Sequence, residues 1–316
     1  MTYAVGGTIQ ANDYNGFVGT TAVNQAYAND TAAQNKIAAL IGVGYGTRGY
    51  GQTATTLASV VAGNTVTAVQ WNNLRSAMST INTQTNSALT LQPAVVAGGQ
   101  ILAEDGTSGR PNISSLIGTL DTNRLTANIT QMSVTSALTS SRSTAWSGTI
   151  SHVFTVAFAS EDAARYYFNS GGEIRFHGSN VGGTTGAAAA WAALLSAMGT
   201  IKMGATTTTY TGTGGTITNN IGYYGLTAAY QEIFIHYGSG PYYSGIYYDI
   251  QVRRENYVGA NGGNGSLIRV TVNFNDHGAV YAYSTINGTT TSAIDQYKAA
   301  GVLTIASPTF TTITGL

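Results

Sequence analysis

A chain of 316 residues with 43% hydrophobic residues is long enough to bury a sizeable core, which excludes an intrinsically disordered protein. Only 8% of its residues are charged, against roughly 25% in a typical soluble domain. The 13 basic residues equal the 13 acidic ones, which excludes the positive field that attracts nucleic acid or an anionic membrane. Because a neutral, sparsely charged surface favours association, the composition predicts a self-assembling protein or an adhesin with an uncharged polar surface.

Several absences narrow the class further. The chain has no cysteine, which excludes disulfide bonds and thiolate metal sites. Residues 1–7 lack the basic and apolar stretches of a secretion signal, so we expect no signal peptide. No apolar run approaches the ~20 residues of a membrane span. We therefore expect no membrane partner, no nucleic-acid partner, and release of the protein by lysis of the cell that makes it.

Residues 1–105 are predicted to form a helical region that docks to neighbours. A first helix is predicted over residues 22–41, where Ala26, Ala33, Ile37 and Leu40 recur at helical spacing. Glycines in the segment 42–46 supply the backbone conformations that end a helix.

A second helix is predicted to start after Asn64, with Thr65 or Thr67 as its N-cap. Its apolar residues follow the spacing of a coiled-coil seam, which continues into Thr85 and Ala88. The four that form the seam are Trp71, Leu74, Met78 and Ile81. Either they pack on the core of their own domain, or they form a short contact between copies and are candidate interface residues. The seam has two heptads, fewer than the three or four that identify a coiled coil.

Residues 106–145 are rich in Ser, Thr and Asn with widely spaced apolar residues, and are predicted to connect the helical region to the next domain. Residues 146–316 are predicted to be rich in β-strands. A strand with one apolar face is indicated where large residues alternate with smaller ones: Ile150, His152, Phe154, Val156 and Phe158 alternate with Ser151, Val153, Thr155 and Ala157. Further strands are predicted at residues 172–177, 200–210, 232–237, 246–254 and 267–275.

One clear helix is predicted in this third region, at residues 184–198. Glu161 and Asp162 are predicted to begin a shorter helix, where acidic side chains complement the helix dipole. The fold class predicted for the whole chain is α+β: a helical N-terminal region followed by a C-terminal domain with an antiparallel sheet or a β-sandwich.

Few residue patterns indicate catalysis. His152, His177 and His236 each lie inside a predicted strand, which is typical of hydrogen-bonded packing residues, and no H-E-x-x-H or H-x-H zinc pattern occurs. The segment 42–46 lacks the Lys-Ser/Thr of a phosphate loop, and no G-x-S-x-G elbow is present. We expect no enzyme activity, no cofactor and no metal. A glycan hydrolase would need two carboxylates to converge from Glu161, Asp162, Glu173, Glu232, Asp249, Glu255 and Asp276.

Tyrosines gather in adjacent pairs, including Tyr242-Tyr243 and Tyr247-Tyr248. Because neighbouring residues of a strand point to opposite faces, each pair places one ring in the core and one outside. Tyrosine offers a large rigid contact area with a polar tip, which suits protein interfaces and sugar-binding surfaces alike. Tyr243 and Tyr248 are therefore candidate surface contacts.

Two parts of the sequence are distinctive as strings. GYGTRGYGQ at residues 44–52 is followed by VTAVQWNNL at 66–74, and AARYYFNSGGEIRF occupies 163–176. Together with residues 222–224 and 241–243, these strings resemble virion structural proteins of tailed bacteriophages, especially phages of cyanobacteria and marine bacteria. The similarity spans most of the chain.

The resemblance implies a non-catalytic structural component of the virion, in the tail, baseplate or neck or associated with a fibre. It implies a homo-oligomer, either a trimer or a ring, that docks to other virion proteins. In the first string, the glycines would let a loop lie against a neighbouring copy. Arg48 would then bond a carbonyl across that contact, which makes Arg48 and Tyr50 candidate interface residues. The alternatives are an adhesin that binds host-surface carbohydrate and a protein that decorates the capsid or collar.

Overall fold

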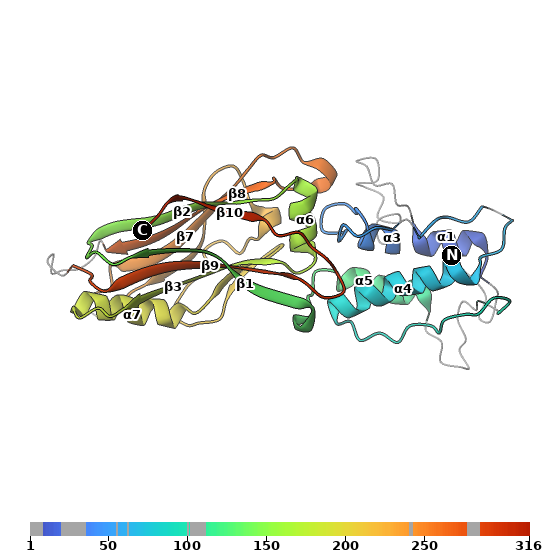
Figure 1. Ribbon diagram of the computed structural model, residues 1–316, viewed down its shortest axis with the longest axis horizontal. Coiled ribbons are helices and arrows are strands. Elements are labelled where there is room, and N and C mark those ends of the chain that lie inside the picture. The colour runs from blue at the N-terminus through green and yellow to red at the C-terminus, as the bar shows by residue number, and fades with distance from the viewer. Residues whose placement is uncertain are drawn as a thin grey trace.

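The computed structural model describes residues 9–19, 36–54, 56–61, 63–99, 101, 112–239, 243–276 and 285–316. The chain has an α+β fold in which helices make up the N-terminal part and two antiparallel sheets make up most of the C-terminal part (Figure 1). The predicted fold class is confirmed. Among the described residues, no helix is both long and apolar enough to cross a membrane.

The N-terminal part contains the helices α1 (Ala11–Val18), α3 (Ile37–Ile41), α4 (Ala68–Thr85) and α5 (Ile113–Thr122). They pack against one another, and their buried side chains are continuous with the core of the sheets. The helix predicted at residues 22–41 falls mostly on residues 20–35, which lie outside the described residues. Its last five residues are helical, as predicted.

The start of α4 follows directly from its sequence. Thr67 Oγ1 accepts a hydrogen bond from Gln70 N at 3.2 Å, and Gln70 Oε1 accepts one from Thr67 N at 2.9 Å. This reciprocal pair is a capping box, and it confirms Thr67 as the N-cap. The helix ends where Asn86 adopts a left-handed conformation with φ of 50°. The predicted continuation of the seam to Ala88 is therefore wrong.

The segment predicted to be a connector is largely regular structure. Its residues 102–111 lie outside the described residues, but the rest holds α5 and the strand β1 (Met132–Arg142), with a short 3-10 turn, Ile129–Gln131, between them. Asn112 caps α5 by accepting a hydrogen bond from Ser115 N at 3.1 Å. The stretch at 106–145 that is predicted to connect the two parts therefore contains regular structure along its described residues. β1 was missed because its Ser- and Thr-rich strand has no apolar face to reveal it.

The two sheets each contain five strands. The first has the order β1, β9 (Thr289–Ala299), β3 (Glu173–Val181), β4 (Ile201–Met203), β5 (Thr208–Tyr210). The second has the order β10 (Thr309–Thr314), β2 (Gly148–Ala157), β8 (Leu267–Asp276), β7 (Ile246–Glu255), β6 (Gln231–Tyr237). The strands predicted at 172–177, 232–237, 246–254 and 267–275 are confirmed, and the one predicted at 200–210 is the β4–β5 hairpin.

The two sheets share a core. Phe154 of β2 and Phe176 of β3 are fully buried, with ring centroids 6.4 Å apart. His152 Nδ1 lies 3.0 Å from Ser292 Oγ of β9, so a buried polar contact also links the sheets. Burial lowers the pKa of His152 to about 4, which keeps the ring neutral at pH 7. His152 is thus a hydrogen-bonded packing residue, as predicted.

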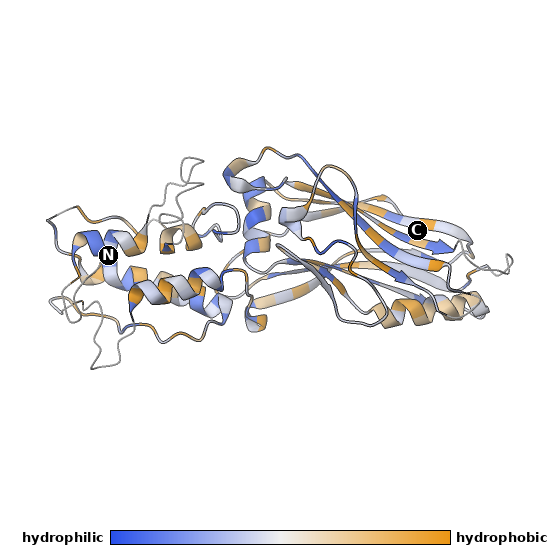
Figure 2. Ribbon diagram, turned by 180° about the vertical axis from the view of Figure 1, so that it is seen from behind, coloured by the Kyte–Doolittle hydropathy of each residue, from blue (hydrophilic) through white to orange (hydrophobic). Residues whose placement is uncertain are grey.

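Two helices belong to this C-terminal part, where the sequence predicted one clear helix and one short one. Figure 2 shows that α7 (Gly186–Met198) is apolar along its length, whereas α6 (Glu161–Asn169) is largely hydrophilic. α7 packs on β3, and its Trp191 lies 5.4 Å from Trp146 and 5.7 Å from Phe274, measured between ring centroids. α6 lies at the end of the sheets that faces the helical part (Figure 1).

Candidate functional site at the junction

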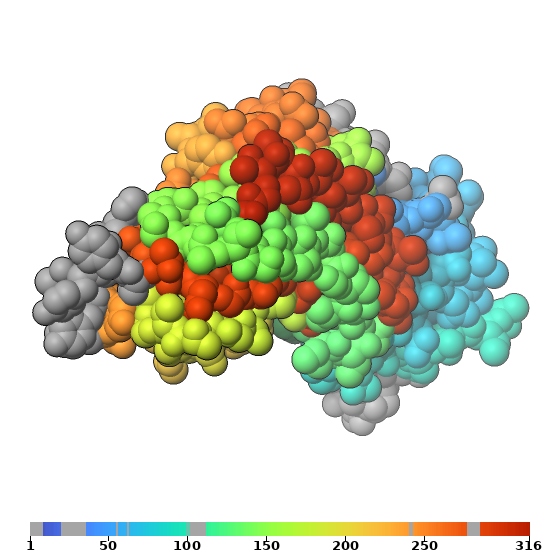
Figure 3. All heavy atoms as spheres, turned by 60° about the vertical axis from the view of Figure 1, so that its left-hand side comes forward, coloured from blue at the N-terminus to red at the C-terminus, as the bar shows by residue number. Residues whose placement is uncertain are grey.

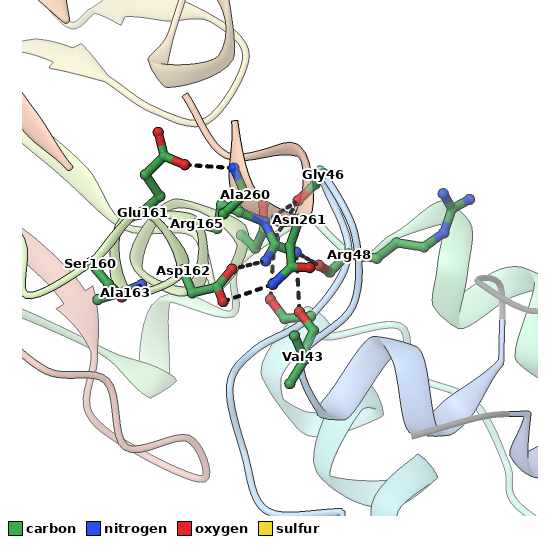
Figure 4. Close-up of polar contacts among 12 residues, drawn as sticks. Val43, Gly46, Arg48, Ser160, Glu161, Asp162, Ala163, Arg165, Ala260 and Asn261 are labelled. Atoms are coloured by element: carbon green, nitrogen blue, oxygen red, sulfur yellow. Dashed lines mark hydrogen bonds and ion pairs between the residues drawn. The ribbon is translucent and has the colours of Figure 1, made fainter. Parts of the chain in front are cut away.

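Three segments meet where the helical part contacts the sheets, and we call this contact the junction. They are the loop 42–52 that follows α3, the helix α6, and the loop 256–265 between β7 and β8. The loop 42–52 contains the string at 44–52, and α6 carries the start of the string at 163–176. Two of the strings that carry the resemblance therefore contact each other (Figure 4).

Arg165 of α6 is the centre of the junction, and its side chain is fully buried. Its guanidinium donates hydrogen bonds to Val43 O at 3.1 Å, Arg48 O at 2.8 Å and Gly46 O at 3.3 Å. It also forms an ion pair with Asp162, one turn earlier on α6. Figure 4 shows these bonds running from α6 to the loop. A planar group with five donors suits a set of fixed carbonyls in a way that a lysine does not.

Asn169 and Tyr224 complete the contact with the same loop. Asn169 Nδ2 donates to Gly46 O and Gly49 O, each at 3.1 Å. The Tyr224 hydroxyl lies 2.8 Å from Asn169 Oδ1 and is also bonded to Gly46 O. Burial raises the pKa of Tyr224 to about 12, so the phenol keeps its proton at neutral pH. The carbonyl of Gly46 thus accepts from three side chains of the sheet domain.

Glycine lets the backbone of the loop lie flat against α6. Gly51 has φ of +67°, and a Cβ placed there would come within 2.2 Å of the Tyr166 ring. Gly49 has φ of +99°, and a Cβ there would come within 2.0 Å of Val43 O. Both positions need a residue that adopts positive φ and has no side chain. Gly51 is therefore explained by the close approach of the loop to α6, and Gly49 by the close approach of the loop to its own backbone.

The other side of the loop faces the helical part. Arg48 forms a two-pronged ion pair with Asp121 of α5, at 2.7 and 2.9 Å. The Tyr50 side chain is buried, and its hydroxyl donates to Arg124 O at 2.6 Å. The hypothesis that Arg48 bonds a carbonyl of a neighbouring copy is thus corrected. The loop does lie against a neighbour, but that neighbour is α6 of the same chain, and Arg165 bonds the carbonyls.

Glu161 fixes the third segment of the junction. Its carboxylate is buried and accepts four backbone N–H bonds at 2.6 to 3.2 Å, from Val258, Gly259, Ala260 and Gly265. Burial raises the pKa of Glu161, but these four donors lower it by more in sum, so that it lies below its ordinary value. Glu161 therefore holds the loop 256–265 in place, in addition to its expected interaction with the helix dipole.

Replacing Glu161 with glutamine is expected to lower the free energy of unfolding by about 1–3 kcal/mol at pH 7, because an amide NH₂ cannot accept these bonds. A carboxyl group with a lowered folded pKa contributes its stability above the unfolded value of 4.5 and loses it as the pH falls through the folded value. Urea unfolding should therefore show the variant and the wild type converging at acidic pH. Glu173→Gln, which changes a quarter-exposed partner of Arg175, is the control. A constant difference across the pH range would contradict this account.

The other candidate interface residues of the helical part are not available to another copy. Trp71, Leu74, Met78 and Ile81 are at most 3% exposed, because they pack into the core of their own chain. The structure thus agrees with the first of the two alternatives for this seam, and the contact between copies is corrected.

The tyrosine candidates divide between surface and core. Tyr248 is fully buried and cannot be a surface contact; its neighbour Tyr247 is the ring that faces out, 5.5 Å from Tyr237. Tyr243 is half-buried and lines a groove of about 460 Å³. The groove also has His236 and Tyr237 on one side and the alanines of α7 on the other. Pro241 and Tyr242 lie outside the described residues.

Among the acidic residues, burial raises the pKa of Glu232, and the nearby charge of Asp249 raises it further. Asp249 is 2% exposed, and its carboxylate accepts bonds from the amides of Asn273, Asn275 and Gln251 at 2.8 to 3.1 Å. Burial raises the pKa of Asp249, an effect that the three amides reduce. The carboxylate is therefore closed off from a substrate.

The charged side chains of the junction are bonded to other groups of the same chain. Their role is therefore to hold the junction together. Among the described residues, no three His, Asp or Glu side chains gather as a metal site would need. Comparisons with protein families, with curated proteins and with solved structures give no match.

Proposed function

We propose that the chain is a structural, non-catalytic component of a bacteriophage particle, associated with the tail or its fibres. The observation that supports this most is the junction. Two strings that resemble virion proteins form one closed hydrogen-bond network, although Gly46 and Arg165 are 119 positions apart. This use of both strings in one contact gives a physical reason why they would occur together.

A structural role needs fixed geometry, and the junction supplies it. A fully buried guanidinium binds three carbonyls, and the loop 42–52 is held between α5 on one side and α6 on the other. Buried polar networks whose groups are satisfied restrict a protein to one arrangement. The low charge and zero net charge are consistent with a surface that is covered in an assembly.

The proposal is tested on particles released from cells that carry the gene and purified after nuclease treatment. Mass spectrometry should find peptides of this chain in constant ratio to the major particle proteins. Cryo-electron microscopy should show density into which the elongated molecule fits. Recovery of the chain only in the soluble lysate would contradict the proposal.

The groove beside Tyr243 favours one alternative, an adhesin that binds host-surface carbohydrate. Aromatic rings beside a groove suit sugar stacking, and Tyr237 is 54% exposed next to it. On this alternative, Tyr243→Ala should abolish binding to an immobilised host polysaccharide while the chain keeps its oligomeric state. Tyr230→Ala, which removes a ring that is 40% exposed and does not line the groove, is the control. Equal binding by wild type and Tyr243→Ala would contradict the alternative.

A further inference from the structure

The edges of the two sheets differ in how they are protected. β6 is covered, because Thr216 and Ile235 exchange two backbone hydrogen bonds of 2.8 and 3.0 Å. β5 has only three residues, and a short edge strand offers little to pair with. β10 ends against β1, where Leu316 N donates to Ser140 Oγ at 2.9 Å. β1 is the longest of the four edge strands, with eleven residues against six in β10 and seven in β6.

The first half of β1 presents unpaired backbone groups. Ala300 N donates to Gln131 O at 2.9 Å, which makes these two residues a hydrogen-bonded pair. Pairs alternate along an antiparallel ladder, so the N–H and C=O groups of Val134 and Ser136 point away from β9. Within the described ranges, no group bonds to them. Val134, Thr135 and Ser136 are exposed, and Figure 3 shows the green β1 segment at the surface.

Two of the usual guards against strand pairing, charged residues and proline, are missing here. Natural edges carry charges, especially Lys, or a proline. Residues 132–141 contain no charged residue and no proline, and the single irregularity is a bulge between Ser136 and Leu138. Exposed apolar side chains also border the start of the strand: Ile129 is 77% exposed, Val134 49% and Val302 44%. Val302 is held there by a 2.9 Å bond from its N to Gln131 Oε1.

We propose that β1 pairs antiparallel with β1 of a second copy of this chain, across a two-fold axis that sets Val134 opposite Val134 of the second copy, to form one continuous ten-stranded sheet. This deepens the proposed function, on which it rests, by naming the partner. The strand is complementary to itself: any register within residues 132–141 sets uncharged residues against each other, so no like charges meet. Because this stretch has no charges, it cannot select a charged partner by forming ion pairs.

A two-fold contact makes the dimer the smallest assembly. The ring expected from the resemblance would then be built from such dimers, because a ring with two-fold axes repeats a pair. A lone trimer has an odd number of copies and no two-fold axis, so the pairing argues against it. The exposed apolar residues at the start of β1 would be covered in the same contact. That removes both the open edge and the apolar patch beside it from water.

Light scattering after size-exclusion chromatography tests the pairing on the full chain. We expect the wild type to have the mass of a dimer or a multiple of it. Val134→Lys should have the mass of a monomer, because it places a charge on the edge and a like charge opposite. Val181→Lys is the matched control, since Val181 is 66% exposed at the end of β3, which has a neighbour on each side. A monomeric wild type, or a Val134→Lys variant that stays a dimer, would overturn the pairing.

Cross-linking gives a second readout that does not depend on a destabilising charge. The chain has no cysteine, so a single introduced cysteine can form a disulfide only between copies. Under mild oxidation, Val134→Cys should give a covalent dimer and Val181→Cys should not. Cross-linking of both variants alike, or of neither, would overturn the pairing. Absence of the chain from purified particles would instead overturn the proposed function, whereas a monomeric wild type in a chain found in particles would overturn the pairing alone.

Discussion

Replacing Arg165 with alanine is expected to lower the free energy of unfolding by about 3–5 kcal/mol, the largest effect of any single change in the junction. The substitution leaves the carboxylate of Asp162 without its buried partner. It also leaves the carbonyls of Val43 and Arg48 without the Arg165 donor. Unsatisfied buried acceptors cost far more than the net gain of the bonds that satisfied them. Urea unfolding followed by tryptophan fluorescence measures the change.

Two further variants separate this mechanism from a general effect of losing a positive charge. Arg142, at the end of β1, donates to Thr144 O at 3.3 Å near the surface, so Arg142→Ala should change stability by less than about 0.5 kcal/mol. Arg165→Lys keeps the charge but cannot reach three carbonyls at once, so it should recover only part of the loss. An Arg165→Ala variant no less stable than Arg142→Ala would contradict the account.

Gly51→Ala is expected to lower the free energy of unfolding by about 3 kcal/mol. About 1 kcal/mol follows from holding alanine at positive φ, and roughly 2 kcal/mol from forcing the Tyr166 ring away from the new methyl group. The structure places that methyl carbon 2.2 Å from the ring. Thermal unfolding of the variant and the wild type measures the loss.

Gly46→Ala is the matched control, because it lies in the same loop. Gly46 has φ of +56°, but no atom lies within 4 Å of where its Cβ would be. This variant should lose only the conformational term, about 1 kcal/mol. Removing the ring in a Gly51→Ala, Tyr166→Ala double variant should restore part of the stability that the steric clash costs. Equal losses for Gly46→Ala and Gly51→Ala would show that the loop does not pack on α6 as described.

The sequence predicts best those elements that have a clear cap or a clear hydrophobic pattern. α4 was found because Thr67 caps it and its apolar stripe recurs at helical spacing. β2 was found because buried Phe154 and Val156 alternate with half-buried residues. β9 was missed because it turns small polar residues inward. Ser292 is fully buried and bonded to His152, and Thr290 accepts a bond from Trp146 Nε1 at 2.9 Å. No hydrophobic alternation marks such a strand.

The two strings of the junction stand out in the sequence, but the sequence does not predict that they meet at one site. Arg48 and Tyr50 were expected at a contact between copies, whereas the contacts that the structure shows for them lie within the chain. The central residue, Arg165, was not singled out, because a lone arginine on a short helix has no sequence signal of burial. Its partners are backbone carbonyls, which every residue has, so the residue types of the loop do not reveal them. Only the excess of glycine at 44–51 could have indicated such a site, because glycine lets other side chains approach the backbone carbonyls.

Native-state hydrogen exchange tests the central claim, that the junction joins the helical part and the sheets into one body. Exchange of backbone amides is followed by mass spectrometry as urea is raised below the unfolding transition. Protected amides of α4 and of β8 should converge on one free energy of opening, and Arg165→Ala should lower the value for α4 far more than for β8. If α4 in the wild type opens at a much lower free energy than β8, the two parts are independent and the claim is wrong.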